Sequence, residues 1–129
     1  MLLDTSGLLA LLHRGEPQHH RAVQAYDTAQ RKITHSYVLA ELIPLANVRG
    51  IRRDLALDFS LQLLAAREVD TVWVSDSLHR EALGLLAARS DKGYSLCDAV
   101  SFVLMRQRGI FESLSTDHHF EQEGFLRLL

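Results

Sequence analysis

The sequence predicts an α/β fold with a mainly parallel central sheet of four or five short strands flanked by helices. Short apolar runs of strand length alternate along the chain with longer segments whose apolar residues recur at helical spacing. This alternation is typical of parallel strands joined by right-handed crossovers. The length of 129 residues fits a single domain over residues 1–129, and a hydrophobic content of 47% supplies an ample core.

The first half of the chain is expected to contain two strands and four helices. In chain order these are a strand over 1–4, helices over 5–13 and 18–30, a strand over 32–36, and helices over 37–49 and 52–68. Ser36 should cap the third helix, Pro44 should kink it because proline removes a backbone hydrogen bond, and Gly50 should end it. The fourth helix is expected to bury a stripe formed by Leu55, Phe59, Leu63 and Ala66.

The second half continues the alternation. A strand over 70–75 precedes a helix over 77–90, a polar loop over 91–95, a helix ending at Gly109, a strand over 110–117, a helical turn over 118–124 and an apolar segment over 125–129. Asp76 or Ser77 should cap the first of these helices, and Ser95 and Asp98 stand at capping-box spacing before the second. The core-facing stripe of the first helix is formed by Leu78, Ala82, Leu85 and Leu86.

Charge, cysteine content and hydropathy exclude several classes of protein. The net charge of -2 and the pI near 6.4 provide no overall basic field, so RNA would have to be held by local arginines or through metal ions. Cys97 is the only cysteine, which excludes an internal disulfide and a cysteine-based zinc cluster. No apolar run approaches about 18 residues and the start lacks a basic segment, so we expect a cytoplasmic protein without a membrane span.

Four acidic residues are expected to meet at one edge of the sheet. Asp4 closes the first predicted strand and Asp117 closes the fourth, at the carboxyl ends where function collects in α/β sheets. Asp98 begins the helix that leads into the fourth strand, and Glu41 lies in the helix after the second. Carboxylates about 4 Å apart repel by roughly 4 kcal/mol per pair. The cluster therefore predicts a bound cation, and oxygen ligands favour Mg²⁺ or Mn²⁺.

Glu41 stands in an almost entirely apolar helix, VLAELIPLANV over residues 38–48. An isolated charged carboxylate in a protein core is costly, so a buried Glu41 would need a partner or a cation. The alternative is a position on a solvated face. Taken one at a time, the three aspartates are also explained as helix caps, so it is the joint pattern that favours a metal site.

Four segments resemble, in order and spacing, the motifs of PIN-domain ribonucleases, especially the small VapC-type toxins: LLDTSGLLALL, SYVLAEL, DKGYSLCDAVSFVLM and LSTDHHFEQEGF. The resemblance spans the whole chain, and its last two segments are the most specific. It implies a single PIN-like domain and a Mg²⁺- or Mn²⁺-dependent endoribonuclease that hydrolyses RNA phosphodiester bonds. Relatives of this kind typically leave a 5'-phosphate and a 3'-hydroxyl.

The resemblance also implies roles for the four acids. Asp4 and Asp98 would bind the metal directly, and Asp117 would hold a second ion or act through water. Glu41 would orient water or serve as a further ligand.

Three more residues are candidates for a place around the acids. Ser6 and Thr116 carry hydroxyls that can orient carboxylates, with helix capping as the alternative for each. Asp91 resembles an additional acid seen in some relatives, and a solvated loop charge is the alternative.

Basic and aromatic side chains are candidates for RNA contacts. The cations that could hold phosphates are Arg49, Arg52, Arg53, Arg89 and Lys92, and a purely solvated role is the alternative for each. Trp73 and Tyr94 could stack on a base. Trp73 lies within a predicted strand, so we expect it in the core instead.

The implied partners are RNA, a small antitoxin protein that covers the acidic pocket, and a second copy of the chain in a homodimer. The alternative function is a PIN-fold binding module with weak catalysis. The tripeptide Asp117-His118-His119 also occurs in DHH-type phosphoesterases, but those place it early in a much longer chain, so both histidines are expected to begin a helix beside the site without binding a metal. A response-regulator receiver needs a lysine after a late strand, a position that neither Lys32 nor Lys92 occupies.

Overall fold

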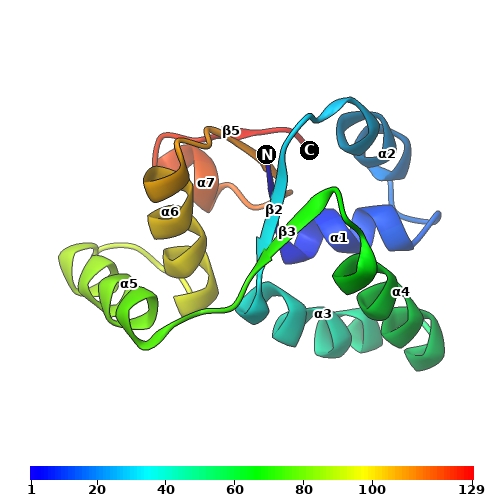
Figure 1. Ribbon diagram of the computed structural model, residues 1–129, viewed down its shortest axis with the longest axis horizontal. Helices are drawn as coiled ribbons and strands as arrows, with labels where there is room; N and C mark the ends of the chain where they lie inside the picture. Colours follow the sequence, from blue (N-terminus) through cyan, green and yellow to red (C-terminus); the bar gives the residue numbers. More distant parts are fainter.

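The computed structural model describes residues 1–129 and has a five-stranded parallel sheet at its centre (Figure 1). The strands are β1 (Leu2–Leu3), β2 (Lys32–His35), β3 (Val69–Val72), β4 (Glu112–Leu114) and β5 (Leu126–Arg127). They lie in the order β3-β2-β1-β4-β5, and every neighbouring pair is parallel. The predicted parallel sheet of four or five strands is confirmed, and the apolar C-terminal segment supplies the fifth strand.

Helices cover both faces of the sheet. They are α1 (Thr5–Leu12), α2 (His19–Thr28), α3 (Ser36–Val48), α4 (Arg53–Ala65), α5 (Asp76–Ala88), α6 (Leu96–Arg108) and α7 (His119–Gln122). The first four lie on one side of the sheet and the last three on the other (Figure 1). Leu3 accordingly packs into the core on the first side, while Leu2 packs with Phe102 and Phe120 on the second. None of the helices has the length and apolarity needed to cross a membrane.

Helix α3 begins differently from the prediction. His35, and not Ser36, is the N-cap, because its Nδ1 accepts a hydrogen bond from the Val38 backbone N–H at 3.4 Å. Ser36 is the first helical residue, and its hydroxyl accepts a bond from the Val74 N–H at 3.1 Å instead. The hydroxyl is thus used to tie the segment after β3 to the start of α3. The helix runs through Pro44 without interruption.

The later helix starts agree more closely with the prediction. Ser75 caps α5, one residue before the predicted Asp76 or Ser77, which lie in its first turn. The capping box of Ser95 and Asp98 at the start of α6 is confirmed in both directions: Asp98 N–H donates to the serine hydroxyl at 3.0 Å, and Ser95 N–H donates to the carboxylate at 2.8 Å.

The buried stripe predicted for α4 is partly wrong. Leu63 is buried and Phe59 and Ala66 are partly buried, but Leu55 is 47% exposed. Ala56 takes the first core position, because its small side chain fits where α4 packs against α3. On α5 all four predicted positions enter the core to different depths: Leu78, Ala82, Leu85 and Leu86.

Strand register lines up four residues along one edge of the sheet. Leu2 pairs with Ile33 in β2, so two residues further on Asp4 stands beside His35, which pairs with Val72. On the other side Leu3 pairs with Leu114, so Asp4 also stands beside Ser115. Neighbouring strands are about 4.8 Å apart, so each residue in this row lies about that distance from the next.

His35 in this row makes stability depend on pH. Its buried ring donates from Nε2 to Ser101, because Nδ1 accepts from the backbone, and burial lowers the pKa of His35 to about 4. The unfolded chain therefore takes up a proton first as the pH falls. We expect the contribution of His35 to the free energy of unfolding to drop as the pH falls from 6.5 to 4, by about 3 kcal/mol in all at about 1.4 kcal/mol per pKa unit.

Chemical denaturation of the wild type and of His35→Asn at several pH values measures this contribution. Asparagine keeps a capping acceptor but does not titrate, so the variant should lack this loss of stability. Parallel profiles for the two proteins would contradict the assignment.

Candidate active site

The four predicted acids lie at the end of the sheet where β1, β2 and β4 finish. Asp4 follows β1 directly, and Asp117 lies on the turn between β4 and α7. Asp98 is in the first turn of α6, and Glu41 is in the second turn of α3. The strand order β2-β1-β4 brings these residues to one edge although they are far apart in the sequence.

Asp4 is a buried carboxylate held by two hydroxyls. Only 7% of the residue is exposed, and its Oδ2 accepts hydrogen bonds from Ser115 Oγ at 2.8 Å and from Ser6 Oγ at 2.9 Å. Burial raises the pKa of Asp4 to about 6, and the negative charge of Asp98 adds to the rise while the two hydroxyls oppose it. The hydroxyls fix the direction of the carboxylate without neutralising its charge.

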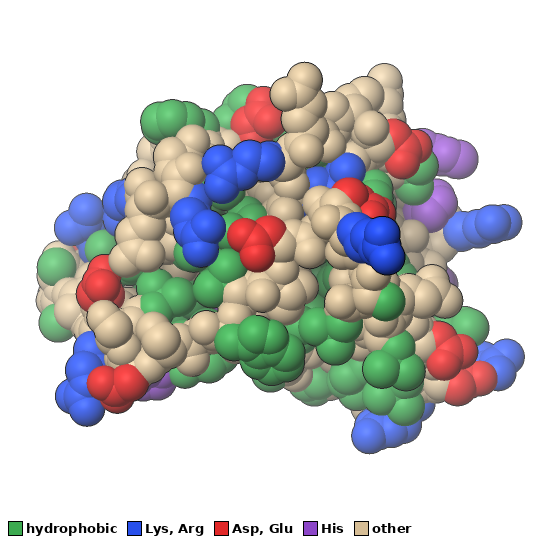
Figure 2. Space-filling view, viewed as in Figure 1, with side chains coloured by type: hydrophobic (Ala, Val, Ile, Leu, Met, Phe, Trp, Pro, Cys, Tyr) green, Lys and Arg blue, Asp and Glu red, His purple; other side chains and the backbone are tan.

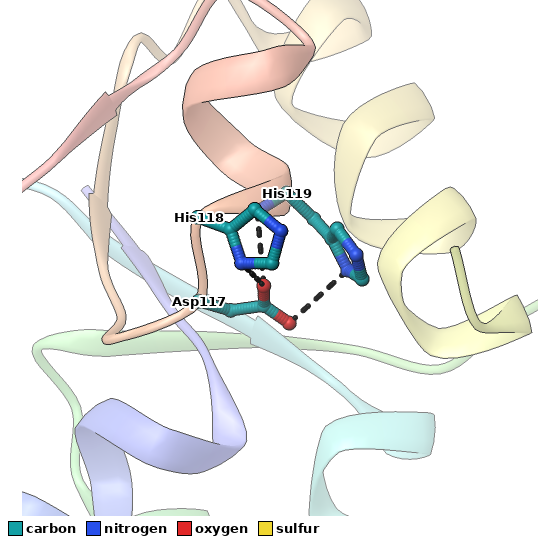
Figure 3. Close-up of side chains that lie close together, drawn as sticks. All are labelled: Asp117, His118 and His119. Carbon is teal, nitrogen blue, oxygen red and sulfur yellow. Dashed lines mark hydrogen bonds and ion pairs between the residues drawn. The ribbon is translucent and has the colours of Figure 1, made fainter. Parts of the chain in front are cut away.

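His119 joins Asp98 to Asp117. Its Nδ1 lies 3.3 Å from Oδ2 of each aspartate. The backbone N–H of His119 also donates to Asp117 Oδ1 at 2.9 Å, and Figure 3 shows the Asp117 carboxylate beside the rings of His118 and His119. The imidazole of His119 is directed toward α6, where Asp98 lies (Figure 3).

Glu41 lies at the exposed rim of the site, so the expectation that it is buried was wrong. Its apolar neighbours pack on one side of α3 only, while Glu41 faces the open side and accepts one hydrogen bond, from Thr5 Oγ1 at 3.1 Å. It still belongs to the acid cluster. Burial raises the pKa of the Cys97 thiol, and the charges of Glu41, Asp4 and Asp98 raise it further, because all three surround this thiol.

The predicted orienting hydroxyls are half right. Ser6 bonds to Asp4 and accepts a hydrogen bond from the Thr116 backbone N–H at 3.0 Å. The Thr116 hydroxyl makes no contact with the acids. Ser115 takes the role that was predicted for Thr116, because Ser115 is the residue beside Asp4 in the neighbouring strand. Its hydroxyl also accepts a hydrogen bond from the Asp117 N–H at 3.0 Å.

The donor set fits a hard divalent cation. Ser115 links Asp4 to Asp117, and His119 contacts both Asp98 and Asp117, although the oxygens of the three aspartates do not all lie within 4.8 Å of one another. The basic side chains in contact with these carboxylates are His118 and His119. The ligand atoms of Asp117, His118 and His119 lie within 4.8 Å of one another, which is also compatible with metal binding. The two histidines were predicted to begin a helix beside the site without binding a metal, and their contacts with Asp117 and Asp98 were not predicted.

The remaining charged candidates form no ion pair with the four acids. Asp91 is exposed, and its Oδ2 lies 3.7 Å from Lys92 Nζ. Arg49 pairs with Glu16 at 3.1 Å, which leaves it less free to hold phosphate than the sequence suggested. Of the other residues predicted to hold phosphate, Arg52 pairs with Asp54 and Arg89 pairs with Glu123. Arg53 forms no ion pair.

The two aromatic candidates exchange their expected environments. Trp73 lies beyond the end of β3 and is 69% exposed, so the expectation that it belongs to the core was wrong. Tyr94 is buried, with its ring 5.1 Å from those of Phe102 and His119. Tyr94 is therefore not free to stack on a base. It supports the ring that bridges the aspartates.

The fold is that of one protein family. A model of the PIN domain matches residues 1–126, and the chain belongs to the PIN-domain family. Among its relatives is the 23S rRNA-specific endonuclease VapC20 of Mycobacterium tuberculosis, from strains H37Rv and CDC 1551. The two are 28% identical over 129 residues, which is 99% of this chain and 97% of the relative.

A solved structure agrees with this relationship. The crystal structure of M. tuberculosis VapC20, a sarcin-ricin loop cleaving toxin, matches with a TM-score of 0.87 and 28% identity, over 97% of this chain and 95% of that one. The predicted resemblance to PIN-domain proteins of the VapC type is confirmed.

Sequence reasoning missed three side chains that contact the acids. Thr5 and Ser115 each follow or flank a predicted strand end, and Ser115 stands two residues before Asp117, so strand alternation was a usable signal. His119 was predicted to begin a helix beside the site, and its contacts with the acids were not predicted. Its position two residues after Asp117 allows the contact with both aspartates.

Proposed function

We propose that this protein is a divalent-metal-dependent endoribonuclease that acts as the toxin of a type II toxin-antitoxin pair in the cytoplasm. The observation that carries the proposal is the convergence of Asp4, Asp98 and Asp117 through Ser115 and His119. RNA as the substrate class is supported by the relative VapC20, which is named as an endonuclease specific for 23S rRNA.

Mg²⁺ or Mn²⁺ is the proposed cofactor, with Asp4, Asp98 and Asp117 as the residues that would hold it. When bound, the cation would neutralise charge on the phosphate and make water a better nucleophile at neutral pH. This donor set has oxygen ligands on three different elements, which suits a cation that prefers carboxylates.

The protein's own groups prepare the site before RNA arrives. Ser6 and Ser115 hold the Asp4 carboxylate in one orientation, and the capping box holds Asp98. Thr5 holds Glu41 at the open rim, where its carboxylate can orient a water molecule or accept its proton. Fixed orientation matters because carboxylates that must reorganise during the reaction stabilise the transition state less.

Two protein partners are proposed as well, a small antitoxin and a second copy of this chain. Hydrophobic side chains gather along the lower part of the face shown in Figure 2, over α3 and α4. The exposed ones are Val48 on α3 and Leu55, Leu57, Leu61 and Leu64 on α4. Exposed apolar surface of this kind is typical of protein-protein contact and supports a protein partner on these helices.

Removal of divalent metal tests the proposed activity directly. Purified protein should cleave single-stranded RNA with Mg²⁺ or Mn²⁺, should stop when EDTA is added, and should resume when excess Mg²⁺ is restored. Cleavage that persists in EDTA would rule out the metal mechanism. Absence of both cleavage and Mg²⁺-dependent thermal stabilisation would favour the alternative, a catalytically weak PIN-fold binding module.

Glu41→Gln separates the rim acid from the buried ones. Because Glu41 is exposed and held by a single hydrogen bond, its neutralisation should lower kcat by about 100-fold, the low end of the range for one acid-base group, and should leave the fold intact. Asp58→Asn is the matched control, since Asp58 is an exposed acid on α4 without an ion pair. Equal cleavage rates for both variants would remove Glu41 from the mechanism.

A further inference from the structure

A hydrogen-bonded tyrosine and histidine join the helix that carries Glu41 to α5. The Tyr37 hydroxyl lies 2.5 Å from Nδ1 of His79, and the two rings meet edge to face with their centroids 5.8 Å apart. Tyr37 is in the first turn of α3 and His79 is at the start of α5. The pair therefore bridges two helices that leave the same end of the sheet.

Tyr37 is placed next to the candidate active site by helix geometry. It precedes Glu41 by four residues, so the two side chains lie on one face of α3 with their Cβ atoms about 5–6 Å apart. Its ring also packs against the apolar cluster that contains Ala99, the residue after Asp98. Tyr37 thus shares a helix face with Glu41 and packs against the helix that carries Asp98.

The pair presents polar atoms and not a free ring face. The Tyr37 ring already has two aromatic neighbours, His35 and His79, with centroids 6.3 and 5.8 Å away. His79 Nε2 makes no hydrogen bond within the protein and is not among the buried unpaired atoms, so it reaches solvent. These features favour hydrogen bonding to a ligand over stacking on a base.

We propose that Tyr37 and His79 bind the RNA phosphate next to the one that is cleaved, an inference that rests on the proposed endoribonuclease function. With its proton on Nδ1, His79 donates to the Tyr37 oxygen, and the phenolic proton then points to a phosphate oxygen. The cationic candidates Arg89 and Lys92 are paired with Glu123 and Asp91. A neutral donor attracts phosphate without competing with the metal for the carboxylates.

Tyr37→Phe tests the contact, because it removes the hydroxyl and keeps the ring. With single-stranded RNA, KM should rise about 10-fold, the loss of one hydrogen bond to a charged group, while kcat changes less than about twofold. Tyr26→Phe is the matched control, since the Tyr26 hydroxyl contacts Glu68 on another part of the surface. An unchanged KM in Tyr37→Phe would overturn the proposal, as would a loss confined to kcat.

Two variants of His79 separate positioning from packing. Asparagine can keep an amide N–H where Nδ1 stands, so His79→Asn should stay close to the wild type. His79→Leu should match Tyr37→Phe, and adding it to Tyr37→Phe should have no further effect, because both act through one hydroxyl. Independent, additive losses would mean that His79 does not act through Tyr37.

The phosphate itself is tested with RNA that carries a single methylphosphonate on either side of the cleavage position. Its binding to an Asp98→Asn background is followed by fluorescence anisotropy, which needs no turnover. A methylphosphonate at one of the two positions should weaken RNA binding when Tyr37 is present and should have no effect on the protein with Tyr37→Phe. Equal sensitivity of both proteins to the methylphosphonate would overturn the proposal. A wild type that binds RNA in this way without cleaving it would refute the proposed function and leave the contact standing.

Discussion

Asp4→Asn is expected to make the metal-free protein more stable at pH 7 while lowering RNA cleavage by at least about 100-fold, as the loss of a metal ligand does. Burial raises the pKa of Asp4 from 3.8 to about 6, so the folded state holds a charge that the unfolded state accommodates more easily. At about 1.4 kcal/mol per pKa unit this costs as much as about 3 kcal/mol. Asparagine removes the charge and still accepts from both serine hydroxyls.

The sign of the pH dependence distinguishes this cause from others. A raised carboxyl pKa destabilises the folded wild type fully above pH 6, and the penalty disappears as the pH falls to 3.8. The stability gap between Asp4→Asn and the wild type should therefore close over that range in EDTA. Mg²⁺ should reverse the order at pH 7 by stabilising only the wild type. A variant less stable than the wild type in EDTA at pH 7 would contradict the assigned cost.

Gly7→Ala is expected to destabilise the protein by about 3 kcal/mol or more, the upper range for overpacking a core. A Cβ atom at Gly7 would lie 2.0 Å from the carbonyl oxygen of Leu114 and 2.7 Å from its carbonyl carbon. Both are backbone atoms of β4, so the neighbour cannot rotate away. Helix α1 would have to move off the sheet, and Asp4 and Thr5 at its start would move with it.

Gly84→Ala is the matched control for this substitution. Gly84 lies inside α5, where an added Cβ meets nothing within 4 Å. Alanine should stabilise this helix by about 0.5–1 kcal/mol, because glycine loses more conformational freedom on folding. Thermal unfolding of both variants gives the comparison. A Gly7→Ala protein with the wild-type melting temperature would show that α1 does not depend on this close approach.

Much of the fold was predictable because local signals agreed with the tertiary structure. The alternation of apolar runs and helical periods predicted the parallel sheet, and the Ser95–Asp98 capping box predicted the start of α6. The position of Leu55 was not predictable in the same way. Two adjacent apolar residues fit a helical stripe equally well, and only the close packing of α3 and α4 selects Ala56 for the core.

The candidate site was predictable in its acids and not in what surrounds them. Carboxylates at strand ends are visible in the sequence, whereas their partners depend on which strands become neighbours. Ser115 contacts Asp4 because β4 lies beside β1, a pairing between residues more than a hundred positions apart. The exposure of Glu41 depends likewise on which side of α3 the rest of the chain covers.

The central place of β1 in the sheet also has a consequence for synthesis. Its neighbours come from opposite parts of the chain, β2 from the first third and β4 from the last. A nascent chain that has not yet delivered β4 leaves one edge of β1 open, and Asp4 then lacks both Ser115, one of the two serines that orient it, and the fourth acid, Asp117. We therefore expect the acid cluster to be complete only after β4 and the turn that follows it have been synthesised.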